Sequence, residues 1–481
     1  MQMKIAIKEE ALIDQVDSYC LKTFKEWRVP GAAVAIVKNG AVIFEKGYGT
    51  RKYGEESPVT PLDLFPIASI TKGFAAASVA LLVDQGKIKW TDRVIDYLPE
   101  FRMFDPWVTR EFQIVDLMTH CSGLHPGVLD QMGLWGYESK DIKRGLAYVE
   151  PVASFRSSYA YVNSPYLWVE DLVEKVSGQP WGDFVKDQIC KPLGMGQTAP
   201  LGEKKGQLIT GHILDEETKT KIKPVSFSIY PSIFMAAGGL ASSVHDLSQW
   251  MLMQLGHKKL ISKENMTYMH KPHTPIEPYI NYGVGWRIID DKPCRVLAHG
   301  GLIMGIKHRL LLVPEADAGI VVLTTLTHSE AAGAITDYFA DLVIGINPKD
   351  YSAELKAAQV VKLPCLASPL SSSDLFRGSK DSRNICENDA IEGDYHSPIL
   401  GKVSVQAEGE KLIMTLGPKR AKAELTHQSR DIFSVYFLGN AGADVGEGSW
   451  GTASFYEGQL ILKGYESFEN ERFVLEKLAS I

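Results

Sequence analysis

Residues 65–73 read Phe-Pro-Ile-Ala-Ser-Ile-Thr-Lys-Gly and place Ser69 three residues before Lys72. The apolar run that follows predicts a helix from residue 70 to about residue 85, ended by Gly86. One turn of this helix stacks the serine on the lysine. Because a serine hydroxyl is a poor nucleophile at neutral pH, an amine one turn away is a means of activating it. The stretch therefore predicts a serine nucleophile at a helix start.

Two further motifs follow at wide spacing. Tyr161-Val162-Asn163 precedes a helical stretch, and His299-Gly300-Gly301 precedes a strand-like run over residues 308–314. Ser-x-x-Lys, Tyr-x-Asn and a late glycine motif, in this order, are the marks of the penicillin-recognising serine hydrolases. Over about residues 29–344 the chain resembles the β-lactamase-related serine hydrolases, a group that includes class C β-lactamases, D,D-peptidases, D-aminopeptidases and esterases.

The resemblance implies that Ser69 forms an acyl-enzyme while Lys72 and Tyr161 share the proton transfers. Which of the two takes the serine's proton stays open. A second Tyr-x-Asn at residues 279–281 is an alternative to the motif at Tyr161. We favour Tyr161 because it lies between the serine and the late glycine motif and opens a helix, whereas Tyr279 precedes a strand.

The resemblance also implies how substrate is held. Asn163 directs its amide to the acyl side of the substrate, or braces its loop instead. The oxyanion hole combines the backbone N–H groups of Ser69 and Leu302. Gly300 and Gly301 let the strand approach the substrate without side chains, although glycines there also fit a β-bulge.

His299 departs from the β-lactamase pattern, because penicillin-binding enzymes usually have lysine at this position. A lysine offers a permanent charge for a substrate carboxylate, whereas a histidine of ordinary pKa gains its charge only as the pH falls through about 6.5. We therefore expect His299 to favour neutral esters or amides over carboxylate-bearing substrates, with the preference shifting near that pH.

Composition sets the broad class. The 481 residues, 45% of them apolar, are enough for two or three domains. The formal net charge of −7 is spread without a basic run, so nucleic acid is not expected as a partner. With no signal-peptide core and no long apolar run, we expect a cytoplasmic protein without a membrane segment, or an exported one if a leader has been removed. The six cysteines lie far apart, which predicts free thiols and no metal site.

Strand-like runs at both ends of the first 348 residues enclose helical ones, which predicts an α+β domain. Residues 31–38 and 42–48, joined by Asn39-Gly40, indicate a hairpin. The resemblance implies an antiparallel sheet flanked by helices, with an all-helical subdomain. A serine-rich stretch over 349–389 reads as a linker. Short alternating runs over 390–481 predict a small all-β domain, similar to lipocalin-like appendages of some relatives.

These observations predict a serine hydrolase without cofactor that acts on small esters, amides or peptides, of the esterase or D-amino-acid peptidase type. The alternative enzyme is a β-lactamase or D,D-carboxypeptidase. The alternative from another class is a slowly turning over, penicillin-binding-like sensor. Whether the chain forms homo-oligomers is open, and so is the role of the β domain. A chain that ends near Pro348 is expected to stay folded, because the catalytic domain closes its own sheet.

Overall fold

The computed structural model describes residues 7–203, 208–215, 220–225, 227, 233–366, 391–429, 431–438, 448–456, 458–464 and 472–478. The chain folds into two compact units that cut across its linear order. The first unit comprises Met1–Pro99, Phe112–His120 and Tyr166–Gln359. The second unit comprises Glu100–Glu111, Cys121–Pro165 and Val360–Ile481. The all-β part of the chain therefore shares a unit with two segments from the middle of the sequence.

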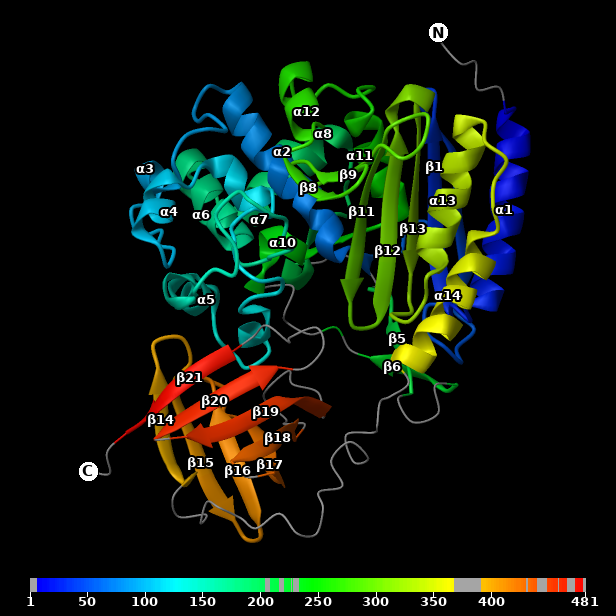
Figure 1. The fold of residues 1–481 in the computed structure, drawn as a ribbon. Coiled ribbons are helices and arrows are strands. Elements are labelled where there is room, and N and C mark those ends of the chain that lie inside the picture. Colours follow the sequence, from blue (N-terminus) through cyan, green and yellow to red (C-terminus); the bar gives the residue numbers. More distant parts are fainter. Residues whose placement is uncertain are drawn as a thin grey trace. The chain divides into compact units, whose positions relative to one another are not determined.

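An eight-stranded antiparallel sheet, in the order β2-β1-β13-β12-β11-β10-β9-β8, forms the centre of the first unit (Figure 1). Asn39 and Gly40 both have positive φ, as the tight hairpin turn between β1 and β2 requires, so the predicted hairpin is confirmed. The strands are β1 (Gly31–Lys38), β2 (Ala41–Gly49), β8 (Thr274–Glu277), β9 (Ile280–Tyr282), β10 (Arg287–Ile289), β11 (Val296–Ile303), β12 (Ile306–Val313) and β13 (Ala318–Thr324).

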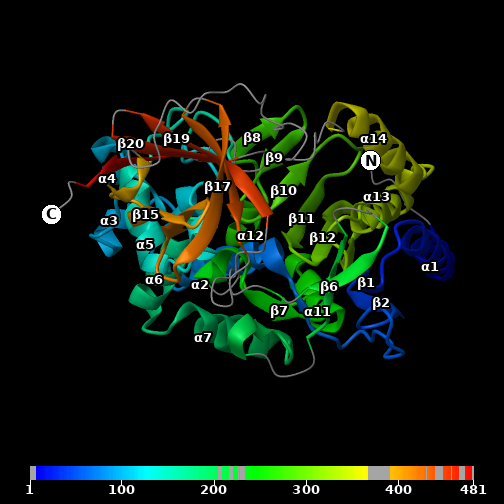
Figure 2. The ribbon, with the colours of Figure 1, turned by 90° about the horizontal axis from the view of Figure 1, so that it is seen from below.

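Helices cover both faces of this sheet. α1, α13 and α14 lie along one face, while α2 and α11 lie on the other (Figure 2). The helices of the first unit are α1 (Glu9–Glu26), α2 (Thr71–Asp84), α3 (Val94–Tyr97), α6 (Tyr166–Ser177), α7 (Trp181–Val185), α8 (Lys191–Leu193), α10 (Met235–Gly238), α11 (Val244–Gln254), α12 (Lys263–Met269), α13 (Ala331–Ile344) and α14 (Tyr351–Leu366), which runs on into the second unit. Shorter turns are η1 (Ala68–Ile70), η2 (Ile114–Met118), η5 (Lys186–Cys190), η6 (Leu201–Glu203) and η7 (Pro314–Ala316). Five short strands complete the unit: β3 (Phe65–Pro66), β4 (Ala199–Pro200) and β7 (Leu240–Ser242) in one small sheet, and β5 (Gly211–Leu214) with β6 (Ile222–Val225) in another.

The helix predicted after Ser69 is α2, and it is buried on every side rather than amphipathic. Its Phe74 ring stacks on Trp250 of α11 with centroids 4.0 Å apart. A methyl group in place of the Gly73 hydrogen would lie 3.4 Å from the same Trp250 ring. Close packing on all sides therefore fixes the helix that carries the candidate nucleophile.

In the second unit, eight antiparallel strands close into a barrel. Buried apolar residues alternate with more exposed ones along strands such as β18, where positions 433, 435 and 437 are buried. The strands are β14 (Gly393–Ser397), β15 (Gly401–Glu408), β16 (Lys411–Leu416), β17 (Ala421–Ser429), β18 (Ile432–Phe437), β19 (Gly448–Tyr456), β20 (Gln459–Gly464) and β21 (Arg472–Lys477). The unit also holds α4 (Pro106–Glu111), η3 (Asp130–Gly133), α5 (Ser139–Gly145) and η4 (Leu146–Tyr148).

The fold confirms the predicted α+β class with an added all-β domain. The boundaries 1–348, 349–389 and 390–481 stay a prediction. Helix α14 occupies the start of the predicted linker, and residues 367–389 lie outside the described residues.

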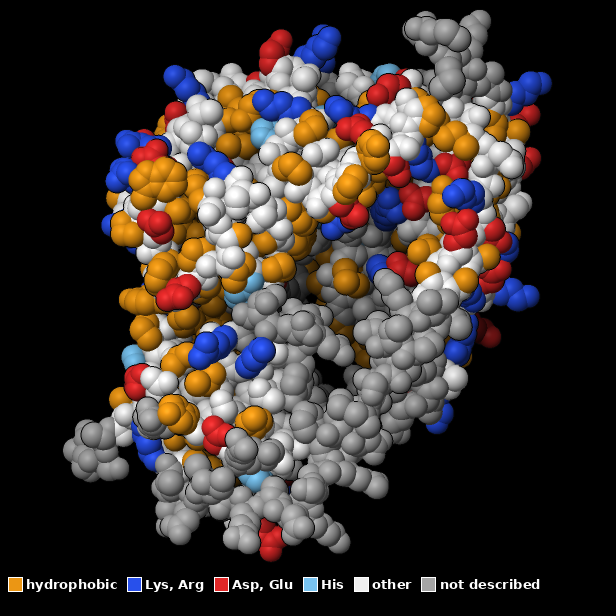
Figure 3. Space-filling model, viewed as in Figure 1, with side chains coloured by type: hydrophobic (Ala, Val, Ile, Leu, Met, Phe, Trp, Pro, Cys, Tyr) orange, Lys and Arg blue, Asp and Glu red, His pale blue; other side chains and the backbone are white. Residues whose placement is uncertain are grey.

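No described helix is long and apolar enough to cross a membrane. Within the same residues, no group of three or more His, Cys, Asp or Glu side chains is placed to hold a metal ion. Cys20, Cys190 and Cys294 are buried free thiols, and Cys121 is buried as well. Lys/Arg and Asp/Glu side chains intermingle on the face drawn in Figure 3.

Candidate active site

The structure brings Ser69 and Lys72 together as the helical spacing predicts. Lys72 Nζ lies 3.3 Å from Ser69 Oγ and donates a hydrogen bond to the Ala237 carbonyl oxygen at 2.8 Å. The lysine side chain is fully buried, and its Nζ lies 5.0 Å from the centre of the Tyr166 ring. Ser69 itself is only half-buried. The serine hydroxyl is therefore accessible to a substrate while the amine beside it is shielded from water.

Ser69 sits in the 3₁₀ turn η1, just before α2 begins. Ala68 has a φ of +45°, in the left-handed region that non-glycine residues rarely occupy. Such strain persists only where the surroundings enforce it, and it is found often at functional sites. The strained turn aims the serine differently from a regular helix start.

His308 on β12 braces this turn from behind. Its Nε2–H donates to the Pro66 carbonyl oxygen at 3.0 Å, and its Nδ1 accepts from the Thr324 backbone N–H at 2.9 Å. Burial lowers the pKa of His308 to about 3, so the ring stays neutral and keeps one donor and one acceptor. A chain of two hydrogen bonds thus joins the nucleophile turn to the central sheet.

Strand β11 lies directly against the nucleophile turn. β10 pairs with β11 only from Val296 to Ala298, and β12 pairs with it from Leu297 to Ile303 in unbroken register. A methyl group in place of the Gly301 hydrogen would lie 2.4 Å from the Ile67 carbonyl oxygen. Gly301 therefore serves close approach and not a β-bulge. Its neighbour Leu302 is 55% exposed, and its role in an oxyanion hole stays a prediction.

His299 does not have the ordinary pKa that its sequence position suggested. Its Nδ1–H donates to the Gly300 carbonyl oxygen at 2.7 Å, so its Nε2 accepts from the Tyr282 hydroxyl at 2.9 Å. Burial, reinforced by the nearby positive charge of Lys72, lowers the pKa of His299 to about 3. This lowered pKa contradicts the expected gain of charge near pH 6.5, because burial disfavours the charged imidazolium and favours the neutral ring that accepts from Tyr282.

Tyr161 and Asn163 belong to the second unit, and their approach to Ser69 stays a prediction. Within that unit the Tyr161 carbonyl accepts from the Gly127 N–H at 3.0 Å, and Asn163 Nδ2 donates to the Asp130 carboxylate at 2.7 Å. The rival Tyr279 lies in the first unit, at a turn before β9, with 69% of its surface exposed and a φ of +66°.

Sequence reasoning missed three partners of the motifs. The Ala237 carbonyl and the Tyr166 ring contact Lys72, and the Tyr282 hydroxyl binds His299. Ala237 and Tyr282 lie in glycine-containing stretches, residues 237–240 and 282–286, in which no residue pattern indicates contact with Lys72 or His299. A backbone carbonyl carries no sequence signal at all.

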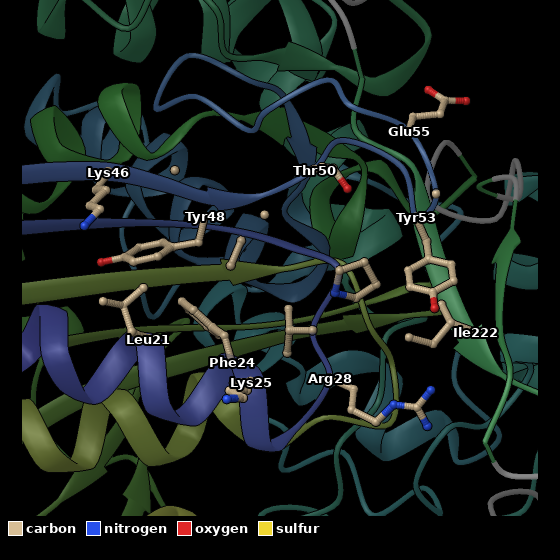
Figure 4. A pocket seen from close by; sticks show the side chains of 16 residues that line it. Leu21, Phe24, Lys25, Arg28, Lys46, Tyr48, Thr50, Tyr53, Glu55 and Ile222 are labelled. Atoms are coloured by element: carbon tan, nitrogen blue, oxygen red, sulfur yellow. The ribbon is translucent and has the colours of Figure 1, made fainter.

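A pocket of about 720 Å³ lies away from these residues (Figure 4). It opens beside β2 at one edge of the sheet, and Phe24, Tyr48 and Tyr53 are among its lining residues. Three strands separate β2 from β11 in the sheet order. None of the candidate residues lines this pocket, so the chemistry of the motifs, and not cavity size, defines the candidate site.

Gly301→Ala should slow acylation of Ser69 roughly a hundredfold, the scale of a displacement of about 1 Å in an active site. The added methyl has no room against the Ile67 carbonyl. Gly300→Ala is the matched neighbour, where the nearest atom would be the His308 carbonyl oxygen at 3.4 Å, and its loss should be far smaller. Labelling rates with a fluorophosphonate measure both, and equal losses would contradict the assignment of close approach to Gly301.

The preference between neutral and carboxylate-bearing substrates should not titrate near pH 6.5. With its pKa lowered to about 3, His299 is neutral throughout the range from pH 5.5 to 8.5. The ratio of kcat/KM for a matched pair of ester substrates, one neutral and one with a carboxylate, measures this preference. A shift with an apparent pKa near 6.5 that His299→Gln abolishes would show that His299 ionises there.

Comparisons with known proteins agree with this geometry. A protein-family model described as Beta-lactamase matches residues 14–344. The unguisins hydrolase of Aspergillus campestris is 26% identical over an alignment of 360 positions, which covers 68% of this chain and 64% of that protein. The chain thus spans less than two thirds of the length of that relative.

Solved structures show the same fold. The octameric penicillin-binding protein homologue from Pyrococcus abyssi superposes with a TM-score of 0.63 at 23% identity, covering 96% of this chain and 100% of that one. The D-stereospecific amidohydrolase from a Streptomyces species gives a TM-score of 0.55 at 22% identity over 68% of this chain and 97% of its own. Because the family match covers most of the chain and includes the Ser-x-x-Lys helix, the chain belongs to the Beta-lactamase family of serine hydrolases.

Proposed function

We propose that this hydrolase acts through an acyl-enzyme on Ser69 and that its substrates are small neutral esters or amides, of the esterase or D-amino-acid peptidase type. The observation that supports this most directly is the buried Lys72 amine 3.3 Å from the Ser69 hydroxyl. A nucleophile beside a shielded base or hydrogen-bond donor is the arrangement that covalent acyl transfer needs.

The first half of the reaction forms a bond between Ser69 Oγ and the substrate carbonyl carbon. The hydroxyl proton passes to Lys72 or Tyr161, and the leaving alcohol or amine takes a proton from the same pair. Water then attacks the acyl-enzyme, the same groups accept and return a proton, and the acid product leaves. The backbone N–H groups of Ser69 and Leu302 are proposed to hold the developing oxyanion, with Gly301 keeping β11 close to the turn.

The substrate class follows from the charge at the third motif. His299 is neutral, buried and bound to Tyr282, so it offers no cation to a substrate carboxylate. This favours neutral substrates and disfavours the alternative assignment as a β-lactamase or D,D-carboxypeptidase. The names of two similar proteins, a hydrolase and a D-stereospecific amidohydrolase, support hydrolysis, and the second supports amide substrates. The octameric state of the homologue from Pyrococcus abyssi supports a homo-oligomer, which we also propose.

Ser69 should be the sole site of acylation. Treatment with a fluorophosphonate or a p-nitrophenyl ester should add one adduct to the intact mass of the protein and none to Ser69→Ala, because the Ser69 hydroxyl lies 3.3 Å from the buried amine of Lys72. A panel of p-nitrophenyl esters, D-aminoacyl anilides and a chromogenic cephalosporin identifies the substrate class. An adduct that maps to another serine contradicts the mechanism, and an adduct that persists for hours on every substrate supports the sensor.

Tyr161→Phe should lower turnover roughly a hundredfold or more, the scale of a lost acid-base group. Tyr279→Phe is the matched control, since it removes the same hydroxyl from the other Tyr-x-Asn motif at an exposed turn. Steady-state kcat for the best ester of the panel measures both. Sensitivity at Tyr279 instead of Tyr161 would overturn the choice of motif.

A further inference from the structure

One end of the barrel is closed by a tryptophan from the segment that carries the second motif. Trp135 follows η3, is 1% exposed, and lies with its ring centre 6.0 Å from those of both Phe437 and Phe473. These two phenylalanines are buried residues of β18 and β21, at positions that alternate inward. The indole therefore packs onto the apolar interior of the barrel.

The barrel end is shaped to receive this segment. Gly417, in the turn between β16 and β17, has a φ of +72°, and a methyl group there would lie 2.4 Å from the Trp135 carbonyl oxygen and 3.2 Å from the Tyr137 ring. The Tyr137 hydroxyl donates to the Leu400 carbonyl oxygen in the neighbouring β14–β15 turn. Two turns at the same end of the barrel thus contact residues 135–137, all of them within the second unit.

The same segment continues directly to the second motif. η3 spans Asp130–Gly133, and the Trp135 N–H donates to the Gln131 carbonyl oxygen at 3.3 Å. At the start of η3, the Asp130 carboxylate accepts from Asn163 Nδ2. The short turn η3 therefore connects Trp135 to Asp130, and Asp130 binds the side-chain amide of Asn163 in the Tyr-x-Asn motif.

Two more hydrogen bonds strengthen this link. The Gly127 N–H donates to the Tyr161 carbonyl oxygen at 3.0 Å, and the Ser164 hydroxyl donates to the Val128 carbonyl oxygen at 3.3 Å. Residues 127–130 are thus bonded to residues 161–164 on both sides of Asn163. These hydrogen bonds join the main chain around Tyr161 to the segment that contains Trp135.

We propose that the barrel is an anchor for catalysis and that Trp135 is the positioning residue through which it holds Tyr161 and Asn163 in place. The inference rests on the proposed function only in giving Tyr161 a chemical role.

The barrel interior also argues against a lipocalin-like carrier, because inward positions such as Phe433, Phe455 and Tyr395 are filled by large apolar side chains. The earlier expectation that a chain ending near Pro348 stays folded loses support, because truncation leaves Trp135 without its partners.

Hydrogen exchange followed by mass spectrometry tests the anchor without any substrate. Trp135→Ala in the full chain should raise exchange in peptides from residues 121–165, including 157–165, while peptides from α2 and β11 stay at the wild-type level. Trp135→Phe, which keeps an aromatic ring at the barrel end, should restore most of the protection. Unchanged exchange around Tyr161 in Trp135→Ala overturns the proposal, and so does exchange raised equally throughout both units.

A gentler pair of variants covers the case in which Trp135→Ala does not fold. Gly417→Ala places a methyl against Trp135 at a positive φ, and Gly409→Ala adds the same methyl at a φ of +68° with no atom within 4 Å. Both substitutions carry similar backbone strain, so their difference isolates the contact with Trp135. Exchange in residues 121–165 should rise in Gly417→Ala only. Equal exchange in the two variants contradicts the proposal.

A double-mutant cycle separates positioning from general destabilisation. Trp135→Ala should lower kcat about ten- to a hundredfold in the wild-type background and much less in the Tyr161→Phe background, because a group that acts through Tyr161 loses its effect once the hydroxyl is gone. Equal losses in both backgrounds contradict positioning. If Tyr161→Phe alone costs nothing while exchange still responds to Trp135→Ala, the anchor stands and the proposed function of Tyr161 fails.

Discussion

The buried amine of Lys72 is the constraint on which the site depends. A lysine side chain with no exposed surface is costly to bury unless its protons are satisfied, and here they are directed to the Ser69 hydroxyl and the Ala237 carbonyl. Meeting that demand fixes α10 beside the first turn of α2 and places the Tyr166 ring of α6 against the amine. The nucleophile is therefore oriented by the same contacts that satisfy the buried amine.

Small residues around the serine make this packing possible. Ala68 adopts a left-handed conformation between Gly301 on β11 and Gly238 on α10, and a methyl group at Gly301 would lie 2.4 Å from the Ile67 carbonyl oxygen. His308, neutral because it is buried, joins the turn to the central sheet. Burial lowers the pKa of His299 and of His308 to about 3, so both rings are neutral at neutral pH.

The second unit gives the barrel a role beyond its own stability. A closed eight-stranded barrel with a filled interior has little capacity for a ligand, but it is a rigid receptor for one inserted aromatic ring. Trp135 uses this receptor, and the hydrogen bonds from residues 127–130 extend its hold to the Tyr-x-Asn motif. The barrel, which lies at the end of the sequence, thereby helps to position the Tyr-x-Asn motif, which lies in the middle of the sequence.

The sequence by itself determined the family, the α+β class, the Ser69–Lys72 pair and the β1–β2 hairpin, because each depends on residues adjacent in the chain or one turn apart. Its strand signals are weak at β14 and β17, where many residues are small or polar, as at Ala421 and Ala423. Only the tertiary structure decided the protonation state of His299 and the placement of Trp135, since Tyr282 and the barrel phenylalanines are distant in sequence. The pKa of His299 depends on its burial, and the position of Trp135 depends on its contacts with the barrel. Both the burial and the contacts arise only when segments distant in the sequence pack together.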